Sequence, residues 1–311
     1  MKRLKKVKQI DIRDKITVNE LVNQMKQSGV MGGGRIAKAV DIYEKMIKDK
    51  DCKIFLGLAG AMVPGGMKNI IIDMLKRGYI HVLVTTGANL THDLVESLGF
   101  SHYQGNPYAS DAELHAKGID RIYDAFMPNQ VYEKMEEFFS KNFNALSSEP
   151  MNITQLLHKI GSLIEQEDSI LNICYKNKIP IFCPAIADSG IGLMIWGNLA
   201  KGKKIQVNAF EDLKEIINIA WGCKNPGVFY IGGGVPKNYV QQAMQFSPSS
   251  ARYGIQITMD RPEPGGSSGA VLREGISWGK MSADADFVDV VCDATIALPM
   301  IYASVKERFS P

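Results

Sequence analysis

The feature of this chain that most limits its possible folds is a repeating pattern of short apolar runs, turns and helices. Each run is followed by a turn rich in glycine, threonine or aspartate. Short apolar runs bounded by such turns are typical of buried strands. The runs are residues 53–58, 80–85, 180–185, 227–231, 253–258 and 287–292. Because these strands alternate with helical segments, we predict an α/β fold with a doubly wound, mainly parallel sheet and helices on both faces.

The rest of the chain adds helices around this pattern. Two amphipathic segments, 17–27 and 35–49, predict a helical extension within residues 1–50, with the glycine-rich residues 29–34 between them. Residues 99–120 mix glycine, proline and charged side chains, so we expect an irregular insertion or lid there. Further helices are expected at 129–145, 152–164, 167–177, 209–221 and 294–308. We find no linker and no internal repeat, and therefore predict that residues 1–311 form a single domain.

Composition excludes several classes of function. The net charge of +3 is too small to predict nucleic-acid binding. No apolar run approaches the roughly 20 residues that cross a bilayer, and the basic residues 1–9 are not followed by the apolar stretch of a secretory signal. The five cysteines and five histidines are scattered without metal-ligand spacing. We therefore predict a cytoplasmic protein with reduced thiols and with no metal site, membrane contact or nucleic-acid partner.

The turns after the predicted strands favour a nucleotide ligand. They contain Gly60, Thr86, Asp188, residues 232–234 and Asp293. In parallel sheets, ligands bind at the carboxyl ends of the strands, where backbone amides hold pyrophosphate and acids hold ribose hydroxyls. The GxGxxG fingerprint of dinucleotide sites is absent. Each glycine cluster taken alone is also explained by a tight turn, but several clusters at strand ends together favour a dinucleotide.

Residues 265–280 carry the most reactive combination of side chains. Lys280 lies two residues after Trp278 and six after Glu274, in a segment too rich in glycine for a regular helix or strand. We expect the indole to remove water from the amine and favour its neutral, nucleophilic form, which can form an imine. We expect the Glu274 carboxylate to hold a cationic amine. The alternative is a surface lysine beside an ordinary tryptophan.

These motifs resemble a known family. The most specific is residues 274–280, Glu-Gly-Ile-Ser-Trp-Gly-Lys. Shorter matches are residues 55–57, 82–86, 118–121, 178–182, 184–185, 232–235 and 293–294. In this order and spacing, the chain resembles deoxyhypusine synthase from about residue 29 to residue 305. The resemblance implies a Rossmann-like, NAD-binding fold and a homotetramer with active sites at subunit interfaces.

The resemblance also implies an activity. NAD takes a hydride from spermidine, 1,3-diaminopropane leaves, and the four-carbon imine passes to Lys280. The group then moves to one lysine of the hypusine-containing translation factor and is reduced there. An imine exchanges between amines without a strong leaving group, which explains the need for a lysine as first acceptor.

The resemblance assigns roles to individual positions. Lys280 is the catalytic residue. The substrate-binding positions are Glu274, Trp278, Asn238, Ser267 and Leu193. The NAD-binding positions are Gly60, Ala61, Met62, Val63, Pro64, Thr86, Gly87, Ala88, Asp188, Gly232, Gly233, Gly234, Thr258, Asp293 and Ala294.

Some of these positions depart from the family pattern. Residues 60–64 read Gly-Ala-Met-Val-Pro instead of Ser-Asn-x-x-Ser, so only backbone contacts to NAD can be kept there. In the family pattern an acidic pair follows the Thr-Thr turn at 85–86, and the second acid holds a ribose. Here Thr-His stands at 91–92 in its place. Leu193 and Ser267 replace aspartates. Asn238 replaces a histidine.

The missing aspartates leave the identity of the amine open. A buried, unpaired ammonium is costly, so either Asp260 and Glu263 take over from the missing acids or the substrate differs. One alternative is an aminoalkyl transferase between small amines, of the homospermidine synthase type. Another is a non-catalytic NAD-binding or regulatory protein. The presence of Lys280, Trp278 and Glu274 together argues against the non-catalytic alternative.

Overall fold

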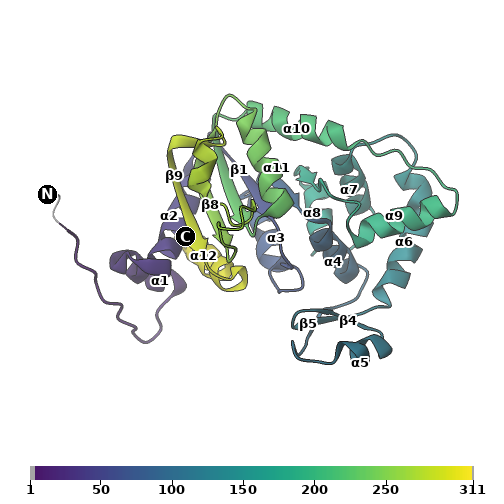
Figure 1. Ribbon diagram of the computed structural model, residues 1–311, viewed down its shortest axis with the longest axis horizontal. Helices are drawn as coiled ribbons and strands as arrows, with labels where there is room; N and C mark the ends of the chain where they lie inside the picture. The colour runs from purple at the N-terminus through teal and green to yellow at the C-terminus, as the bar shows by residue number, and fades with distance from the viewer. Residues whose placement is uncertain (1–3, 310–311) are drawn as a thin grey trace. The chain divides into compact units, whose positions relative to one another are not determined.

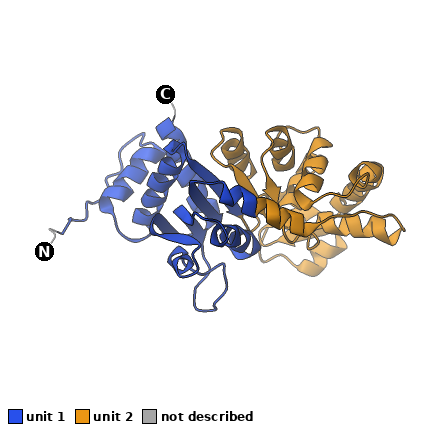
Figure 2. Ribbon diagram, turned by 90° about the horizontal axis from the view of Figure 1, so that it is seen from above, with its two compact units in different colours: residues 1–57, 217–311 blue, residues 58–216 orange. Residues whose placement is uncertain are grey.

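The computed structural model describes residues 4–309 of the chain. The chain divides into two compact units, which Figure 2 shows in blue and orange. Unit 1 comprises Met1–Gly57 and Ile217–Pro311, and unit 2 comprises Leu58–Ile216. Unit 1 is therefore built from both ends of the chain. No helix within residues 4–309 is both long and apolar enough to cross a membrane.

The sheet of unit 1 follows the predicted pattern. Its neighbouring strands are β1 (Cys52–Leu58), β7 (Asn225–Ile231), β8 (Ala251–Thr258) and β9 (Met281–Val291). β7 pairs with β8 in parallel, and β8 pairs with β9 in parallel. β1 and β7 are almost continuously buried, as expected for strands covered on both faces. The prediction of a parallel sheet is confirmed.

Helices cover both faces of this sheet (Figure 1). On one face, α2 (Met31–Lys48) and α12 (Ala294–Phe309) pack against the strands, and Tyr43 meets Phe229 edge-on with ring centroids 5.2 Å apart. On the other face lie α11 (Gly234–Gln245) and the short 3₁₀ helix η1 (Leu272–Ile276). The backbone N–H of Leu272 donates to the Asp289 carboxylate of β9 at 3.0 Å. The predicted doubly wound arrangement is therefore confirmed.

The N-terminal helices differ from the prediction in one detail. Helix α1 (Val18–Ser28) ends at Gly29, whose left-handed φ of 71° lets its N–H bond to the carbonyl of Met25. Helix α2 then begins at Met31, so the glycines at 32–34 lie inside the helix and not in a linker. A Cβ on Gly34 would lie 2.7 Å from the backbone of Gly29, so glycine permits this close approach.

Unit 2 is mostly helical. Its strands β2 (Val82–Thr85) and β6 (Ile181–Phe182) pair in parallel. Its helices are α3 (Lys68–Lys76), α4 (Gly87–Ser97), α5 (Asp111–Ala116), α6 (Val131–Leu146), α7 (Ile153–Ser162), α8 (Ile170–Lys176) and α9 (Gly190–Ala200). Helix α10 (Ala209–Trp221) carries the chain back to unit 1.

The segment predicted to be irregular is ordered into secondary structure. A small antiparallel sheet forms from β3 (Tyr103–Gln104), β5 (Ala125–Pro128) and β4 (Ile119–Ile122), with α5 against β4. The Arg121 guanidinium donates to both oxygens of Asp111, at 2.6 and 2.8 Å. The expectation of an irregular segment was therefore wrong. Strands of two to four residues are too short to show an alternation of apolar and polar side chains.

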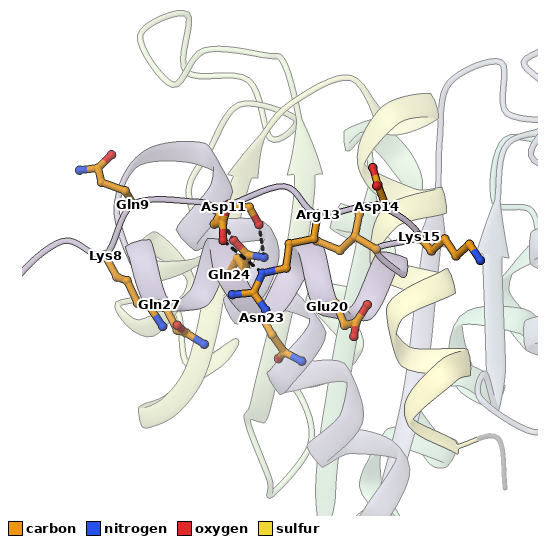
Figure 3. A pocket seen from close by; sticks show the side chains of 11 residues that line it. Lys8, Gln9, Asp11, Arg13, Asp14, Lys15, Glu20, Asn23, Gln24 and Gln27 are labelled. Atoms are coloured by element: carbon orange, nitrogen blue, oxygen red, sulfur yellow. Dashed lines mark hydrogen bonds and ion pairs between the residues drawn. The ribbon is translucent and has the colours of Figure 1, made fainter.

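A hollow of about 460 Å³ lies between the N-terminal segment and α1 (Figure 3). Its lining is polar and carries charges of both signs. Arg13 pairs with Asp11 at 3.2 Å, and the Gln24 side chain makes two hydrogen bonds with the Asp11 backbone. None of the predicted site residues lines it, and we assign no function to it.

Candidate functional site

A second cavity, of about 140 Å³, lies entirely within unit 1. It is lined by Asn238, Gln241, Gly265, Ser267, Ala270, Val271, Glu274, Gly275, Trp278 and Lys280. One wall is α11, and the other is the loop 265–271 together with η1. All the predicted substrate-binding residues except Leu193 meet here, together with the predicted catalytic lysine.

Lys280 is held by its backbone on both sides. The 3₁₀ helix η1 is followed by Gly279, whose φ of 68° reverses the chain. The Lys280 N–H then donates to the carbonyl of Gly275 at 2.8 Å, and the Lys280 carbonyl accepts from Ala251 at 3.1 Å. Lys280 therefore stands at the start of β9 on a fixed backbone, and only its side chain is free to move.

Trp278 touches the amine without covering it. The Lys280 Nζ lies 4.9 Å from the centroid of the Trp278 ring, which is a cation–π geometry. The indole is 57% exposed. From the sequence we expected the indole to remove water from the amine. A ring that is open to solvent on one face does not exclude water, so this expectation is not met within this chain.

Glu274 is the only carboxylate among the described residues that line the cavity. It lies on η1, six residues before Lys280, and lines the cavity, while its backbone carbonyl accepts a hydrogen bond from the Ser277 hydroxyl at 2.9 Å. A single carboxylate can anchor one ammonium group. The cavity is therefore suited to hold one cationic end of an amine.

Sequence reasoning missed Lys237, which lies on α11. Only 1% of this lysine is exposed, and its Nζ donates to the carbonyls of Ser267 at 2.6 Å and Ala270 at 2.5 Å. Burial lowers the pKa of Lys237 to about 8, and the charges of Asp289 and Glu274 act in the opposite direction. The buried ammonium thus fixes the loop 265–271 over α11. The feature that could have revealed it is a lysine at one of the buried positions of α11.

Three polar residues lie in a row under this loop. Tyr230, Gln256 and Asp289 are register partners on β7, β8 and β9 and share one face of the sheet. The Gln256 amide donates to the carbonyl of Ala270 at 3.0 Å. The Tyr230 hydroxyl and the Gln256 Oε1 are buried without a hydrogen-bond partner among residues 4–309. Burial also raises the pKa of Asp289. The layer beneath the cavity is thus polar and buried.

The predicted NAD-binding residues fall into two groups, one in each unit. In unit 1 they lie at the carboxyl ends of β7, β8 and β9 and are Gly232, Gly233, Gly234, Thr258, Asp293 and Ala294. Gly232 and Gly234 have left-handed φ values of 69° and 58°, and Gly233 begins α11 without any side-chain cap. The N–H groups of a helix start without a cap fit a phosphate.

Two members of this group also have structural partners. Thr258 accepts a hydrogen bond from the Asp260 N–H at 3.1 Å. Asp293 accepts one from the Thr295 N–H at 2.7 Å at the start of α12, so it serves as a helix cap whatever else it binds.

In unit 2 the predicted residues lie before α3, at the start of α4 and just before α9. They are Gly60, Ala61, Met62, Val63, Pro64, Thr86, Gly87, Ala88 and Asp188. Thr86 caps α4, and a Cβ on Gly87 would lie 2.4 Å from the side chain of Ser189, next to Asp188. Gly87 is therefore needed for close packing. The Val63 side chain is only 2% exposed, so only its backbone is available to a ligand.

Comparison with known proteins identifies the family. A family model described as deoxyhypusine synthase matches residues 20–305. The chain is 46% identical over 304 residues to a Methanosarcina mazei protein named "Probable deoxyhypusine synthase 1", covering 98% of this chain and 95% of that protein. It is 42% identical to an Archaeoglobus fulgidus protein of the same name, with 96% and 97% covered. This chain belongs to the deoxyhypusine synthase family. It is therefore an enzyme, a transferase, of hypusine biosynthesis and polyamine chemistry.

A solved structure agrees with this assignment. The crystal structure of an Entamoeba histolytica protein assigned as a deoxyhypusine synthase superposes with a TM-score of 0.70, covering 96% of both chains at 20% identity. At this identity the likeness shows the fold alone, and it confirms the α/β architecture expected of a deoxyhypusine synthase.

Two residues that line this cavity depart from the pattern expected from the family resemblance. Ser267 and Asn238 line it where the family resemblance leads one to expect an aspartate and a histidine. Leu193 lies on α9 of unit 2, is 54% exposed and is not among the lining residues. Asp260 and Glu263 are exposed and do not line the cavity either.

Proposed function

We propose that this chain is a deoxyhypusine synthase that transfers the aminobutyl group of spermidine, through an imine on Lys280, to a lysine of the hypusine-containing translation factor. The observation that carries the proposal is one cavity shared by Lys280, Trp278 and Glu274, in a chain that belongs to this family.

The transfer steps are amine exchanges at an imine carbon. The Lys280 Nζ attacks this carbon and forms a C–N bond, and the original C–N bond breaks with its electrons leaving on 1,3-diaminopropane. The acceptor lysine of the translation factor then displaces Lys280 in the same way. Glu274 holds the ammonium at the far end of the four-carbon chain, and the Trp278 face packs against that chain and its charge.

NAD is the proposed cofactor. When bound, it supplies a hydride acceptor for spermidine and a hydride donor for the final product. The uncapped start of α11, with its two left-handed glycines, is suited to hold the pyrophosphate. Thr258 and Asp293 lie at the neighbouring strand ends, where hydroxyl groups of the cofactor would bind.

We further propose a homotetramer in the cytoplasm. The half-exposed Trp278 leaves the cavity open to water, and a second chain over it would complete the site. Leu193, Trp196 and Leu199 are exposed along the apolar helix α9, which supports association. The scattered thiols of the sequence support the compartment.

Trapping the imine tests the function. After incubation with NAD and spermidine followed by borohydride, mass spectrometry should find an aminobutyl group on Lys280. Lys280→Arg should lose all transfer but still bind NAD, because a guanidinium stays protonated and cannot form the imine. An unmodified Lys280 in wild type, or full transfer by the variant, would contradict the assignment.

The single carboxylate of the cavity favours one second candidate, a transferase between small amines of the homospermidine synthase type. The acceptor distinguishes the two. Enzyme carrying the labelled imine should pass it to the translation factor if the first proposal holds, and to putrescine if the second does. A chain that forms no imine from spermidine would instead be a non-catalytic member of the family.

A further inference from the structure

The amine cavity of unit 1 is open at one end and buried at the other. Glu274 and Trp278, on η1 and just after it, are exposed. Gln241 on α11 and Gly275 on η1 line the same cavity and are buried, and only 7% of Gln241 is exposed. The carboxylate of the cavity therefore lies at its open end. Among the described residues that line the cavity, none at the buried end carries a carboxylate.

The buried end contains an amide that has no partner. A Cβ on Gly275 would lie 3.7 Å from the Gln241 Nε2 and 3.5 Å from the Lys280 Cβ, so the amide lies beside the stem of Lys280. The Gln241 side chain makes no hydrogen bond with another group within residues 4–309. Its amide is not sealed off as the Gln256 Oε1 is, and so stays open to the cavity. Because buried polar groups are normally hydrogen-bonded, this amide is evidence for a bound ligand.

The charges around the buried end oppose a second cation there. The Lys237 ammonium binds two carbonyls of the loop 265–271, which forms part of the wall. Asp289 and Glu274 act on this lysine and raise its pKa, so part of their charge is already balanced, whereas the nearby Lys280 acts in the opposite direction. An ammonium at this end would be buried near two lysines without a carboxylate of its own, which is costly.

An amide is suited to an uncharged amine. Its oxygen accepts a hydrogen bond from the N–H of the amine and leaves the lone pair of the nitrogen free. An amine can lose a hydride from the adjacent carbon only while this lone pair is free, because the pair forms the C=N bond. A free alkyl amine has a pKa of about 10 and is almost entirely protonated at neutral pH. The cavity must therefore favour the neutral form of the reacting nitrogen.

We propose that Gln241 determines the specificity of the cavity by binding one nitrogen of the amine substrate in its uncharged form, while Glu274 holds a second, cationic nitrogen at the open end. This inference rests on the proposed aminoalkyl transfer. It assigns the cavity to amines that carry at least two nitrogens, of which one is neutral when bound. It also explains why Ser267 can stand where the family resemblance leads one to expect an aspartate, because a neutral nitrogen needs no second carboxylate.

Nuclear magnetic resonance of a bound amine labelled with ¹⁵N tests the proposal without any reaction. Spermidine or putrescine is bound, without NAD, to Lys280→Arg, which forms no imine and keeps its own proton. At neutral pH we expect one nitrogen of either bound amine to be neutral and the rest to be charged. Adding Gln241→Glu should keep every nitrogen charged, because a carboxylate stabilises the ammonium. Bound amines that are fully charged beside Gln241 would overturn the proposal.

Two substitutions of Gln241 test its use in the reaction. Gln241→Glu should lower kcat on the order of 100-fold about two pH units below the pKa of the amine, without raising KM for the amine. This loss should shrink roughly tenfold for each pH unit gained, because the neutral amine becomes more abundant. Gln241→Leu removes the hydrogen bond without adding a buried charge. It should raise KM about 3- to 10-fold and leave the pH dependence unchanged.

Gln27→Glu is the matched control, because Gln27 is exposed on α1 and does not line the amine cavity. It should leave kcat, KM and the charge of the bound amine unchanged. Unchanged KM in Gln241→Leu together with an unchanged pH profile in Gln241→Glu would overturn the specificity role. Absence of the Lys280 imine in wild type would instead refute the proposed function, and the ¹⁵N measurement would still decide the charge of the amine at Gln241.

Discussion

Lys237 and Lys280 show how two lysines of one sequence take different roles. Lys280 has its backbone fixed and its amine in an open cavity beside Trp278. Lys237 is buried, and its amine binds two carbonyls of the loop that forms the opposite wall. Burial lowers the pKa of Lys237, and the nearby Lys280 lowers it further. Lys237, which binds one wall of the cavity, is therefore not part of the motif that contains Lys280.

The stability of the protein should report the burial of Lys237. Its pKa is lowered from 10.5 to about 8. Between these pH values the unfolded chain binds a proton that the folded chain does not, so the free energy of unfolding rises with pH. Lys237→Met cannot titrate and should lack this gain. The advantage of wild type over the variant in urea unfolding should grow by about 1–3 kcal/mol from pH 8 to pH 10.5. A constant difference would contradict the assigned burial.

Among the helices, α8 depends on a carboxylate from another element. Asp93 of α4 is fully buried and accepts from the Ser169 hydroxyl at 2.8 Å and from the N–H groups of Ile170 and Leu171 at 2.8 and 3.0 Å. These are the donors that a helix start leaves unpaired. The carboxylate thus joins α4 to the first turn of α8.

Asp93→Asn should weaken this junction. Its amide group brings a donor toward existing donors and removes the charge that favours a helix N-terminus, so we expect a loss of about 2–3 kcal/mol in the free energy of unfolding. Hydrogen exchange at Ile170 and Leu171 should accelerate. Asp168→Asn is the control, because Asp168 is exposed and its pairing with Lys68 is long at 3.6 Å. Equal stability of Asp93→Asn and wild type would show that the carboxylate is not needed.

In the molecule as a whole, helix α9 lacks a cover for its apolar side. Its sequence is almost entirely apolar, yet only Ile191 and Asn198 of it are buried within the chain. Leu193, Trp196 and Leu199 are 54%, 65% and 44% exposed. Exposed apolar surface of this kind marks an association site, in agreement with the proposed homotetramer.

Trp196→Glu should therefore reduce the size of the assembly. A charge in an apolar contact is costly to desolvate, so sedimentation should show a smaller species than wild type with the same helical content. Tyr175→Glu, at a residue 45% exposed on α8, is the matched control and should sediment like wild type. A wild-type protein that sediments as a single chain would refute both the assembly and the role of α9.

Much of the fold followed from local patterns. Short apolar runs with turns at their ends predicted the parallel sheet, because burial on both faces makes a strand apolar throughout. The Ser-Trp-Gly-Lys motif at 277–280 drew attention to Lys280, since a reactive lysine needs particular neighbours close in sequence. The glycines at 32–34 and the short strands of 103–128 were misjudged, because glycine also permits close helix packing and two- to four-residue strands leave no periodicity to detect.

Only the tertiary structure brought distant residues together. Asn238 and Lys280 line one cavity although they lie on different elements, and Leu193 stays outside it. The burial of Lys237 and of Gln241 is likewise a property of packing. Local sequence fixes the backbone preferences and the chemistry of each side chain. The surroundings that set its charge, partners and access to water come from segments far along the chain, and so depend on how those segments pack.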